Sequence, residues 1–241
     1  MVDNPENQAP NENPRILCLA NSRKLRGRCI AGREIVNRQL GRWIRPVSNR
    51  EHQEVSREEY HYEDGSDPCL LDVMAVPLVE ARPHLFQQEN WLLDPNFYWR
   101  KTGRVDWAEL QAFVDLQGPL WLNQDSSFNG LNDRIVLAQA NQLRSSLRLI
   151  HLDQLRIEVS CPGAAFGNPK RRVQGQFIYA GVHYFLWLTD PVYERRLLAQ
   201  PNGIHKLGEC CLTISLGESF EGYAYKLIAA IIERGQTEYY E

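Results

Sequence analysis

Residues 15 to 48 read RILCLANSRKLRGRCIAGREIVNRQLGRWIRPVS, and this stretch decides the fold prediction. It contains three short segments rich in β-forming residues, and Gly27 and Gly32 fit turn or bulge positions between or within them. The third segment ends at Pro46, which cannot donate to a sheet ladder and therefore marks a strand end or an edge. The pattern predicts three successive strands, the first two joined by a charged turn, SRKLRGR, at residues 22–28.

The same stretch concentrates positive charge. Residues 15–50 hold ten Arg or Lys and a single Glu, a local charge of +9, although the whole chain of 241 residues carries −3. A positive face on a mildly acidic protein favours a polyanionic ligand. Residues 51–68 reverse the charge, with seven Asp or Glu against Arg57. They fit a solvated loop or short helix, or a cover over the positive face that competes with a polyanion.

Bulk composition indicates a folded protein with a substantial core, because 43% of the residues are apolar and 24% are charged. No apolar run approaches the roughly 20 residues that cross a bilayer, and the polar N-terminus lacks the apolar core of a signal peptide. We therefore expect a cytoplasmic protein without a membrane partner. Six cysteines without a CxxC pair are expected to be reduced core residues. Residues 1–14 are predicted to be a disordered arm.

The middle of the chain predicts one strand and two helices. Residues 70–83 form a long strand candidate in which Pro77 requires a bulge or an edge. Helical spacing of apolar residues predicts a helix within 105–119 and a second from about Asp133 to Ser146, capped by Asn132. Residues 101–147 are therefore expected to be a helical connector between two β-rich halves.

The second half has the clearest topology. A strand over 146–160 is followed by a hairpin over 170–190 that turns near Ala180 and Gly181, and Asp190 with Pro191 begins a helix. Two apolar segments close the chain, residues 209–217 and 222–233; the last also satisfies a helical period, but its β-branched and aromatic residues favour a strand. The order β, β, β, α, β, β is that of a five-stranded OB barrel. The predicted fold is mainly β with α: two OB-like barrels, residues 15–100 and 148–241, joined by the helical connector.

Three stretches of the chain also resemble a known family: ILCLANSRKLRGRCIAG, GRWIRPVS and SLGESFEGYAYKLIAAII. They are similar to the flanking motifs of the bacterial dual OB-containing domain family, and the resemblance spans nearly the whole chain after the N-terminal arm. It implies two OB-like barrels in one polypeptide and suggests nucleic-acid binding. It implies no catalytic residues. The residues that carry it are Ala20, Asn21, Ser22, Arg23, Gly27, Arg28, Cys29, Trp43, Ile44, Arg45, Pro46, Ser215, Leu216, Gly217, Glu218, Gly222, Tyr225 and Lys226.

OB barrels that hold single strands combine cations for phosphates with aromatic rings on which bases stack. Both occur here, and no basic recognition helix stands out, so single-stranded DNA or RNA is favoured over duplex. The alternative for each aromatic is a place in a barrel core, and for the arginines a solvated or internally paired surface. The candidate nucleic-acid-binding residues are Arg23, Lys24, Arg26, Arg28, Arg42, Trp43, Arg45, Lys170, Arg171, Arg172, Tyr179 and Tyr184.

Catalytic and metal sites are weakly indicated. No phosphate-loop or dinucleotide motif is present, and the Cys and His residues lack the short spacing of a zinc site, so no cofactor or metal is expected. A metal-dependent nuclease would need Asp72 and Glu80, which lie about 26 Å apart on an extended strand. Cys29 beside Arg28 is a possible nucleophile, but a buried strand thiol fits better. The main alternative to nucleic-acid binding is a protein-interaction module, accessory to a larger defence or mobile-element assembly, that docks through a strand edge.

Overall fold

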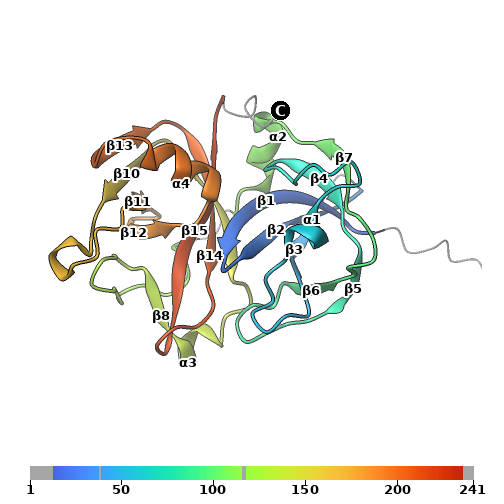
Figure 1. Cartoon of the computed structure of the whole chain (residues 1–241), viewed down its shortest axis with the longest axis horizontal. Helices are drawn as coiled ribbons and strands as arrows, with labels where there is room; N and C mark the ends of the chain where they lie inside the picture. Colours follow the sequence, from blue (N-terminus) through green and yellow to red (C-terminus); the bar gives the residue numbers. More distant parts are fainter. Residues whose placement is uncertain (1–12, 38, 116–117, 236–241) are drawn as a thin grey trace, which may run out of the picture.

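The computed structural model describes residues 13–37, 39–115 and 118–235, and two strongly curved sheets lie side by side in it (Figure 1). Strands dominate both halves, and the helices among the described residues are short. The predicted arm, residues 1–14, lies outside the described residues except for Asn13 and Pro14. The protein is therefore mainly β, as the sequence predicts.

The first sheet closes into a barrel. Its strand order is β5-β6-β3-β2-β1-β4-β7, and β4 and β5 are separated only by Val76 and Pro77, so the path returns on itself. β3 pairs with β6 in parallel, whereas the other neighbours are antiparallel. The predicted interruption at Pro77 is thus real, because it divides residues 70–83 into two strands. The strands are β1 (Arg15–Lys24), β2 (Gly27–Val36), β3 (Gln39–Val47), β4 (Asp72–Ala75), β5 (Leu78–Ala81), β6 (Asn90–Leu93) and β7 (Arg100–Arg104).

The second sheet repeats this connectivity. Its order is β13-β10-β11-β12-β15-β14-β9, and β9 and β10 are separated only by Asp153 and Gln154. β12 and β15 form the parallel pair. The predicted single strand over 146–160 is therefore bent into two. The strands are β8 (Arg134–Val136), which pairs with β15 off the main path, β9 (Leu147–Leu152), β10 (Leu155–Ser160), β11 (Arg172–Tyr179), β12 (Val182–Leu188), β13 (Gly203–Leu207), β14 (Cys210–Leu216) and β15 (Tyr223–Glu233).

Both barrels have the OB pattern. When split strands are counted once, strand 1 pairs with strands 2 and 4, and strand 3 pairs with strands 2 and 5. The hairpin between β11 and β12 turns where predicted, since Ala180 and Gly181 have φ angles of 48° and 76°, as a tight hairpin turn requires. The last segment is a strand rather than a helix. The prediction of two OB-like barrels is confirmed.

Helices are minor elements, and here the sequence prediction is partly wrong. The predicted helix over 133–146 is a short strand, β8, followed by a single turn of helix, because pairing with β15 and the use of Ser145 and Ser146 as hydrogen-bond donors to Glu89 override helical propensity. The helix within 105–119 is also short. The helices are α1 (Arg57–Tyr60), α2 (Trp107–Leu110), α3 (Leu137–Ala140), α4 (Pro191–Leu198) and the 3-10 turns η1 (Gln111–Phe113) and η2 (Ala164–Phe166).

The longest helix, α4, starts as predicted. The Asp190 carboxylate accepts hydrogen bonds from the backbone N–H groups of Val192 and Tyr193, at 2.9 and 3.1 Å, which is N-capping, and Pro191 occupies the first turn. A second oxygen of Asp190 accepts from the N–H of Ile231 on β15 at 3.2 Å. Asp190 therefore fixes α4 against the last strand of the barrel.

The two barrels share a wall of three strands, β9, β14 and β15, whose two faces are both buried. On β14, Cys211 packs in the core of the first barrel, whereas Cys210 and Leu212 pack in the core of the second. Leu149 and Ile150 divide in the same way on β9. Strands buried on both faces read as continuous apolar runs, which explains why residues 209–217 and 222–233 lack polar alternation.

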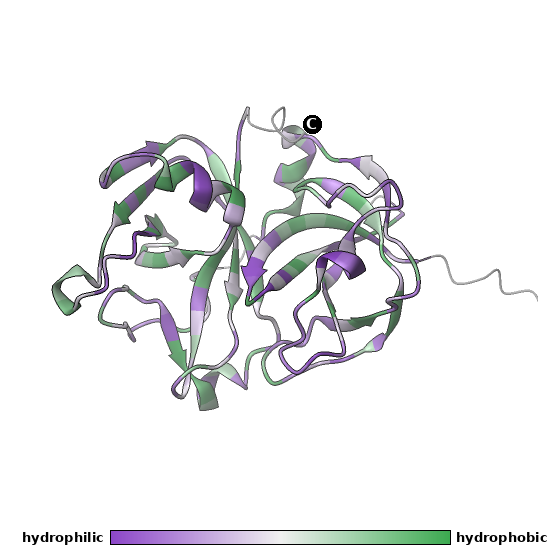
Figure 2. Ribbon diagram, in the orientation of Figure 1, coloured by the Kyte–Doolittle hydropathy of each residue, from purple (hydrophilic) through white to green (hydrophobic). Residues whose placement is uncertain are grey.

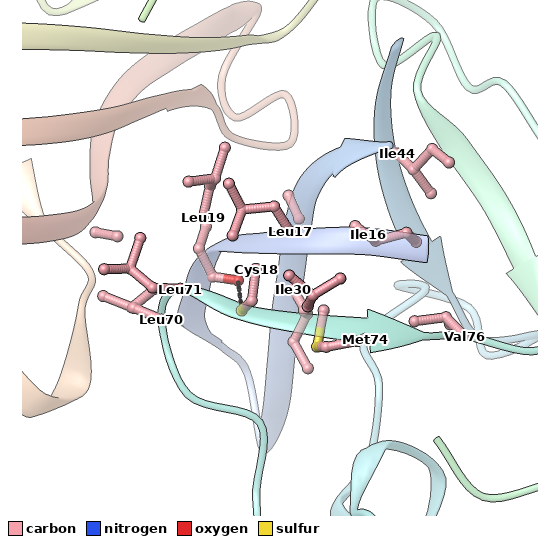
Figure 3. Close-up of a cluster of buried hydrophobic side chains, with 14 of the residues drawn as sticks. Ile16, Leu17, Cys18, Leu19, Ile30, Ile44, Leu70, Leu71, Met74 and Val76 are labelled. Carbon is pink, nitrogen blue, oxygen red and sulfur yellow. Dashed lines mark hydrogen bonds between the residues drawn. The ribbon is translucent and has the colours of Figure 1, made fainter. Parts of the chain in front are cut away.

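Strand β1 is the element of the first barrel that meets this wall. Leu17 and Leu19 project from β1 on the side opposite Cys18 (Figure 3), and all three are fully buried. The Thr213 hydroxyl of β14 donates to the Leu19 carbonyl at 2.5 Å. Hydropathy colouring shows the apolar length of β1 ending in a hydrophilic tip (Figure 2). That tip carries the charged turn to the boundary between the barrels.

Candidate nucleic-acid interface

The charged turn between β1 and β2 docks on the second barrel. The Arg23 guanidinium binds both carboxylate oxygens of Glu194 on α4, at 2.5 and 3.0 Å, and Lys24 forms an ion pair with Glu218 at 2.7 Å. Arg26 is exposed. Two of the predicted phosphate-binding cations are thus neutralised within the chain.

The acidic segment, residues 51–68, runs beside the charged turn. Arg28 and Val55 exchange backbone hydrogen bonds of 2.8 and 3.0 Å, which places the acidic segment against β2. Its ion pairs are mostly local: Glu59 binds Arg50, and Asp67 binds Arg57 at 3.3 Å. The segment therefore borders the turn, but these carboxylates do not bind the cations of the turn.

On β3, the three predicted site residues have different roles. Arg42 is exposed, lies over the Trp91 ring at 4.2 Å and pairs with Glu34 at 3.3 Å. Trp43 is 7% exposed and Arg45 is 2% exposed. The Trp43 ring therefore offers no free face to a base, and Arg45 is not a surface cation.

In the second barrel, the basic run 170–172 is also divided. Lys170 is exposed, and Arg172 is exposed with its guanidinium 5.7 Å from the Trp187 ring centre. Arg171 instead donates to the carbonyls of Leu198 and Gln200 at 2.7 and 2.5 Å, where α4 ends. Arg171 thus satisfies terminal helix carbonyls, whereas its neighbours remain available to a ligand.

The two predicted tyrosines face inward. Tyr184 has no exposed surface, stacks on Phe177 at 5.3 Å and accepts a hydrogen bond from the Leu120 N–H at 2.9 Å. Tyr179 shares the inward parity of Phe177 and donates to the Asp115 carbonyl at 3.2 Å. The Tyr184 ring therefore offers no free face to a base in this structure.

Alternation along β11 and β12 places a different set of side chains on the outer face of the barrel. Phe185 and Trp187 on β12 are partly exposed, and they lie opposite Gln176 and Gln174 on β11. We name the outward set the β11–β12 face. The members of this set follow a period of two in the sequence, because every second residue on each strand shares a face. It consists of Arg172, Gln176, Ile178, His183, Phe185 and Trp187.

Two neighbouring strands extend this face with positive charge. Arg156 on β10 is in direct register with Gln176, and Lys206 on β13 is in register with Arg156. A row of four side chains, Lys206, Arg156, Gln176 and Phe185, therefore crosses the sheet. The sequence prediction missed both cations because they are isolated along the chain and meet only through strand pairing.

A loop, residues 122–132, borders the β11–β12 face. The Asn129 carbonyl accepts from the Gln174 side chain at 2.5 Å, and the loop presents Phe128, which is 88% exposed. Lys226 on β15 holds the loop in place, because its ammonium donates to the Leu122 carbonyl, to Asn123 Oδ1 and to the Asn132 carbonyl at 2.7 to 2.8 Å. Burial lowers the pKa of Lys226 to about 7.

Residues 14–231 match the family model of the dual OB-containing domain. The chain belongs to this family. The match covers both barrels and agrees with the strand order of each. A search of curated proteins found no significant match, and a search of solved structures found none either.

The nuclease hypothesis finds little support in this dual OB protein. Asp72 is 1% exposed and binds Lys101 at 2.9 Å and Arg104 at 3.1 Å, so its carboxylate is used to join β4 to β7. Glu80 is exposed on β5. Within the described ranges, no three His, Cys, Asp or Glu side chains are grouped as metal ligands, and no helix has the length and apolar character to cross a membrane.

Proposed function

We propose that the protein binds single-stranded nucleic acid on the β11–β12 face without catalysing a reaction. The observation that carries the proposal is the position of Phe185 and Trp187 beside Arg172, on the second and third strands of an OB barrel. In this fold those strands bind oligonucleotides. The face is open in the region of Gln176 and Ile178, which are both exposed.

The chemistry of the face suits unpaired bases. Aromatic rings stack on the flat faces of bases, and those faces are accessible only when the bases are unstacked. The Gln176 amide supplies a donor and an acceptor for base edges, and Arg156 and Lys206 supply positive charge for phosphates. The eight-residue helix α4 buries Tyr193 and Leu197 against the barrel, so it is not free to enter a groove of duplex DNA.

The test is fluorescence anisotropy with a labelled, mixed-sequence DNA or RNA of about 12 nucleotides, within the site size of OB folds. Trp187→Ala and Phe185→Ala should each raise Kd by roughly 5- to 150-fold, which corresponds to about 1 to 3 kcal/mol per stacked base. Phe97→Ala is the matched control, because Phe97 is 63% exposed on the first barrel. Affinity should also fall with salt, by a logarithmic slope of about 0.7 per phosphate contacted. The proposal would be overturned if Trp187→Ala and Phe185→Ala bound the strand as tightly as Phe97→Ala, or if the wild type did not bind at low salt.

The charged turn of the first barrel is a weaker second contact in this proposal. Arg26 is exposed, and Arg23 and Lys24 become available only when a polyanion displaces Glu194 and Glu218. Exposed ion pairs contribute about 0 to 1 kcal/mol, so such displacement costs little. Arg26→Gln should therefore lower the salt slope slightly and leave the stacking contribution unchanged.

A second candidate function is protein interaction, and the observation that favours it is the edge strand β13. Among the described strands, β13 pairs only with β10, and its Ile204 is 54% exposed. A partner strand can add to such an edge, as expected of an accessory subunit in a larger assembly. Purification from the host with and without nuclease separates the candidates: bound material that nuclease removes supports nucleic-acid binding, whereas a retained stoichiometric protein supports docking.

A further inference from the structure

A cavity of about 180 Å³ lies at the junction of the two barrels, and its lining shares no residue with the β11–β12 face. The first barrel contributes Ser22 to Leu25 of the charged turn, Cys29 and Arg45, and the second contributes the end of β14 with the loop that follows it, Ser215 to Glu218. Stretches from near the two ends of the described chain therefore line one site.

Arg45 lines this cavity with most of its hydrogen-bonding capacity unused. A guanidinium has five N–H donors. Arg45 uses two, to Asn90 Oδ1 at 3.1 Å and to Ser146 Oγ at 3.0 Å, and its Nε has no partner in the structure. The residue is only 2% exposed, and none of the described carboxylates forms an ion pair with it. A buried cation without a direct counter-charge is unfavourable, and an anionic ligand would relieve it.

Arg45 is linked to the buried Glu89 carboxylate through a hydroxyl group. Ser146 Oγ donates to Glu89 at 2.9 Å, so a hydroxyl group stands between the guanidinium and the buried carboxylate. Glu89 also accepts from the Ser146 N–H at 2.5 Å, which fixes that hydroxyl in place. This arrangement orients the guanidinium and leaves three of its five N–H donors unused.

Further donors line the cavity. Lys24, whose side chain is only 15% exposed, pairs with Glu218 at 2.7 Å, and the Ser215 hydroxyl forms no hydrogen bond with the described residues. Arg23 also lines the cavity, but its guanidinium is already paired with Glu194, which does not line the cavity. If Glu218 is displaced, Lys24 and Arg45 leave two positive charges, which match a dianion.

We propose that this cavity binds a phosphate monoester, with Arg45 at its base and Lys24 and Ser215 as further donors. A tetrahedral phosphate presents three terminal oxygens, so it can accept from a guanidinium, an ammonium and a hydroxyl group together, whereas a carboxylate has two oxygens. The phosphate can belong to the end of an oligonucleotide or to a free nucleotide. The proposal does not depend on binding at the β11–β12 face.

Calorimetric titration and thermal unfolding of the full chain test the cavity, with adenosine 5′-monophosphate, inorganic phosphate and adenosine as probes. We expect the first two to bind and adenosine to fail, and a 100-fold excess over Kd should raise Tm by roughly 5 to 11 °C. Ser215→Ala and Lys24→Gln should each weaken binding by about tenfold or more, as expected for a hydrogen bond to a charged group. Glu218→Gln should strengthen it, because it removes the competing carboxylate.

Arg100→Gln is the matched control, since Arg100 is exposed on β7 and does not line the cavity. Arg45→Lys tests the contribution of the guanidinium to phosphate binding. If the Arg45 variant does not fold, Ser215→Ala still tests the cavity. Failure of both phosphate probes to bind, or binding that is unchanged in Ser215→Ala, Lys24→Gln and Glu218→Gln, would overturn the proposal.

Oligonucleotides with and without a 5′-phosphate distinguish a strand end from a free nucleotide as the source of the phosphate. They also separate the cavity proposal from the proposed binding at the β11–β12 face. Preference for the phosphorylated strand over the free nucleotide identifies a strand end as the ligand. If a 5′-hydroxyl strand binds and Trp187→Ala abolishes this binding while adenosine 5′-monophosphate does not bind, the proposed function stands and the cavity proposal fails. Binding of the nucleotide without any binding of the 5′-hydroxyl strand gives the opposite result.

Discussion

Lys226→Met tests the clamp that holds loop 122–132 against β15. The Lys226 ammonium donates to three oxygens at 2.7 to 2.8 Å and has no exposed surface. Burial lowers its pKa from 10.5 to about 7, and nearby Asp133 acts in the opposite direction. Methionine keeps the length and apolar volume of the side chain but donates no hydrogen bond.

Two contributions of similar size oppose each other in this substitution. Three hydrogen bonds from a charged donor contribute about 5 to 9 kcal/mol, and the lowered pKa corresponds to a burial cost of about 5 kcal/mol at 1.36 kcal/mol per unit. The variant should therefore lose about 0 to 4 kcal/mol of unfolding free energy near pH 7. Because this net value is small, the pH dependence is the sharper measurement.

The sign of that dependence follows from the pKa values. Between about pH 7 and pH 10.5 the folded lysine releases its proton while the unfolded one retains it, so the unfolded state binds more protons. The stability of the wild type should rise with pH relative to Lys226→Met, by up to about 1.4 kcal/mol per pH unit. The burial cost is fully present below pH 7 and disappears above pH 10.5.

Urea unfolding followed by tryptophan fluorescence at pH 7, 8 and 9 measures this difference. Lys206→Met, at an exposed lysine on β13, is the control for removal of a lysine from the chain. Amide exchange in loop 122–132 should also be faster in Lys226→Met. A difference in unfolding free energy that stays constant from pH 7 to pH 9 would refute the reasoning, because it would mean that the lysine stays protonated throughout.

Two further substitutions test the barrels themselves. Gly32→Ala should reduce soluble yield and cost more than about 4 kcal/mol, because a Cβ at this position would lie 1.9 Å from the Leu17 carbonyl oxygen; Gly103→Ala, with no atom nearer than 3.9 Å, should fold normally. Arg171→Ala should lower Tm by roughly 2 to 8 °C through loss of its bonds to the end of α4, whereas Lys170→Ala should leave Tm unchanged and weaken oligonucleotide binding. An Arg171→Ala protein with wild-type Tm would contradict its helix-capping role.

Features that are encoded locally were predictable from the sequence. The turn at Ala180 and Gly181, the start of α4 at Asp190 and the break at Pro77 each depend on the backbone preferences of a few neighbouring residues. The strand order follows from these elements taken in sequence. The helix expected over 133–146 failed because pairing with β15, about 90 residues away, outweighs local propensity.

The site was less predictable because exposure depends on contacts between distant segments. Arg45 is buried with Asn90 and Ser146, which lie 45 and 101 residues further along the chain, and no local sequence pattern predicts that contact. The aromatic hairpin was different. Alternation already separates Tyr184 from Phe185, but the sequence does not say which parity faces the core until the barrel closes.

The strands that are buried on both faces have a consequence for synthesis of the protein. The first barrel is complete in sequence at about residue 104, yet the wall that covers β1 includes β15, which ends at Glu233. During translation, this side of β1 lacks part of its cover until that last strand leaves the ribosome. The nascent chain therefore carries an exposed apolar flank for more than half of its elongation, a period in which a chaperone has a surface to bind.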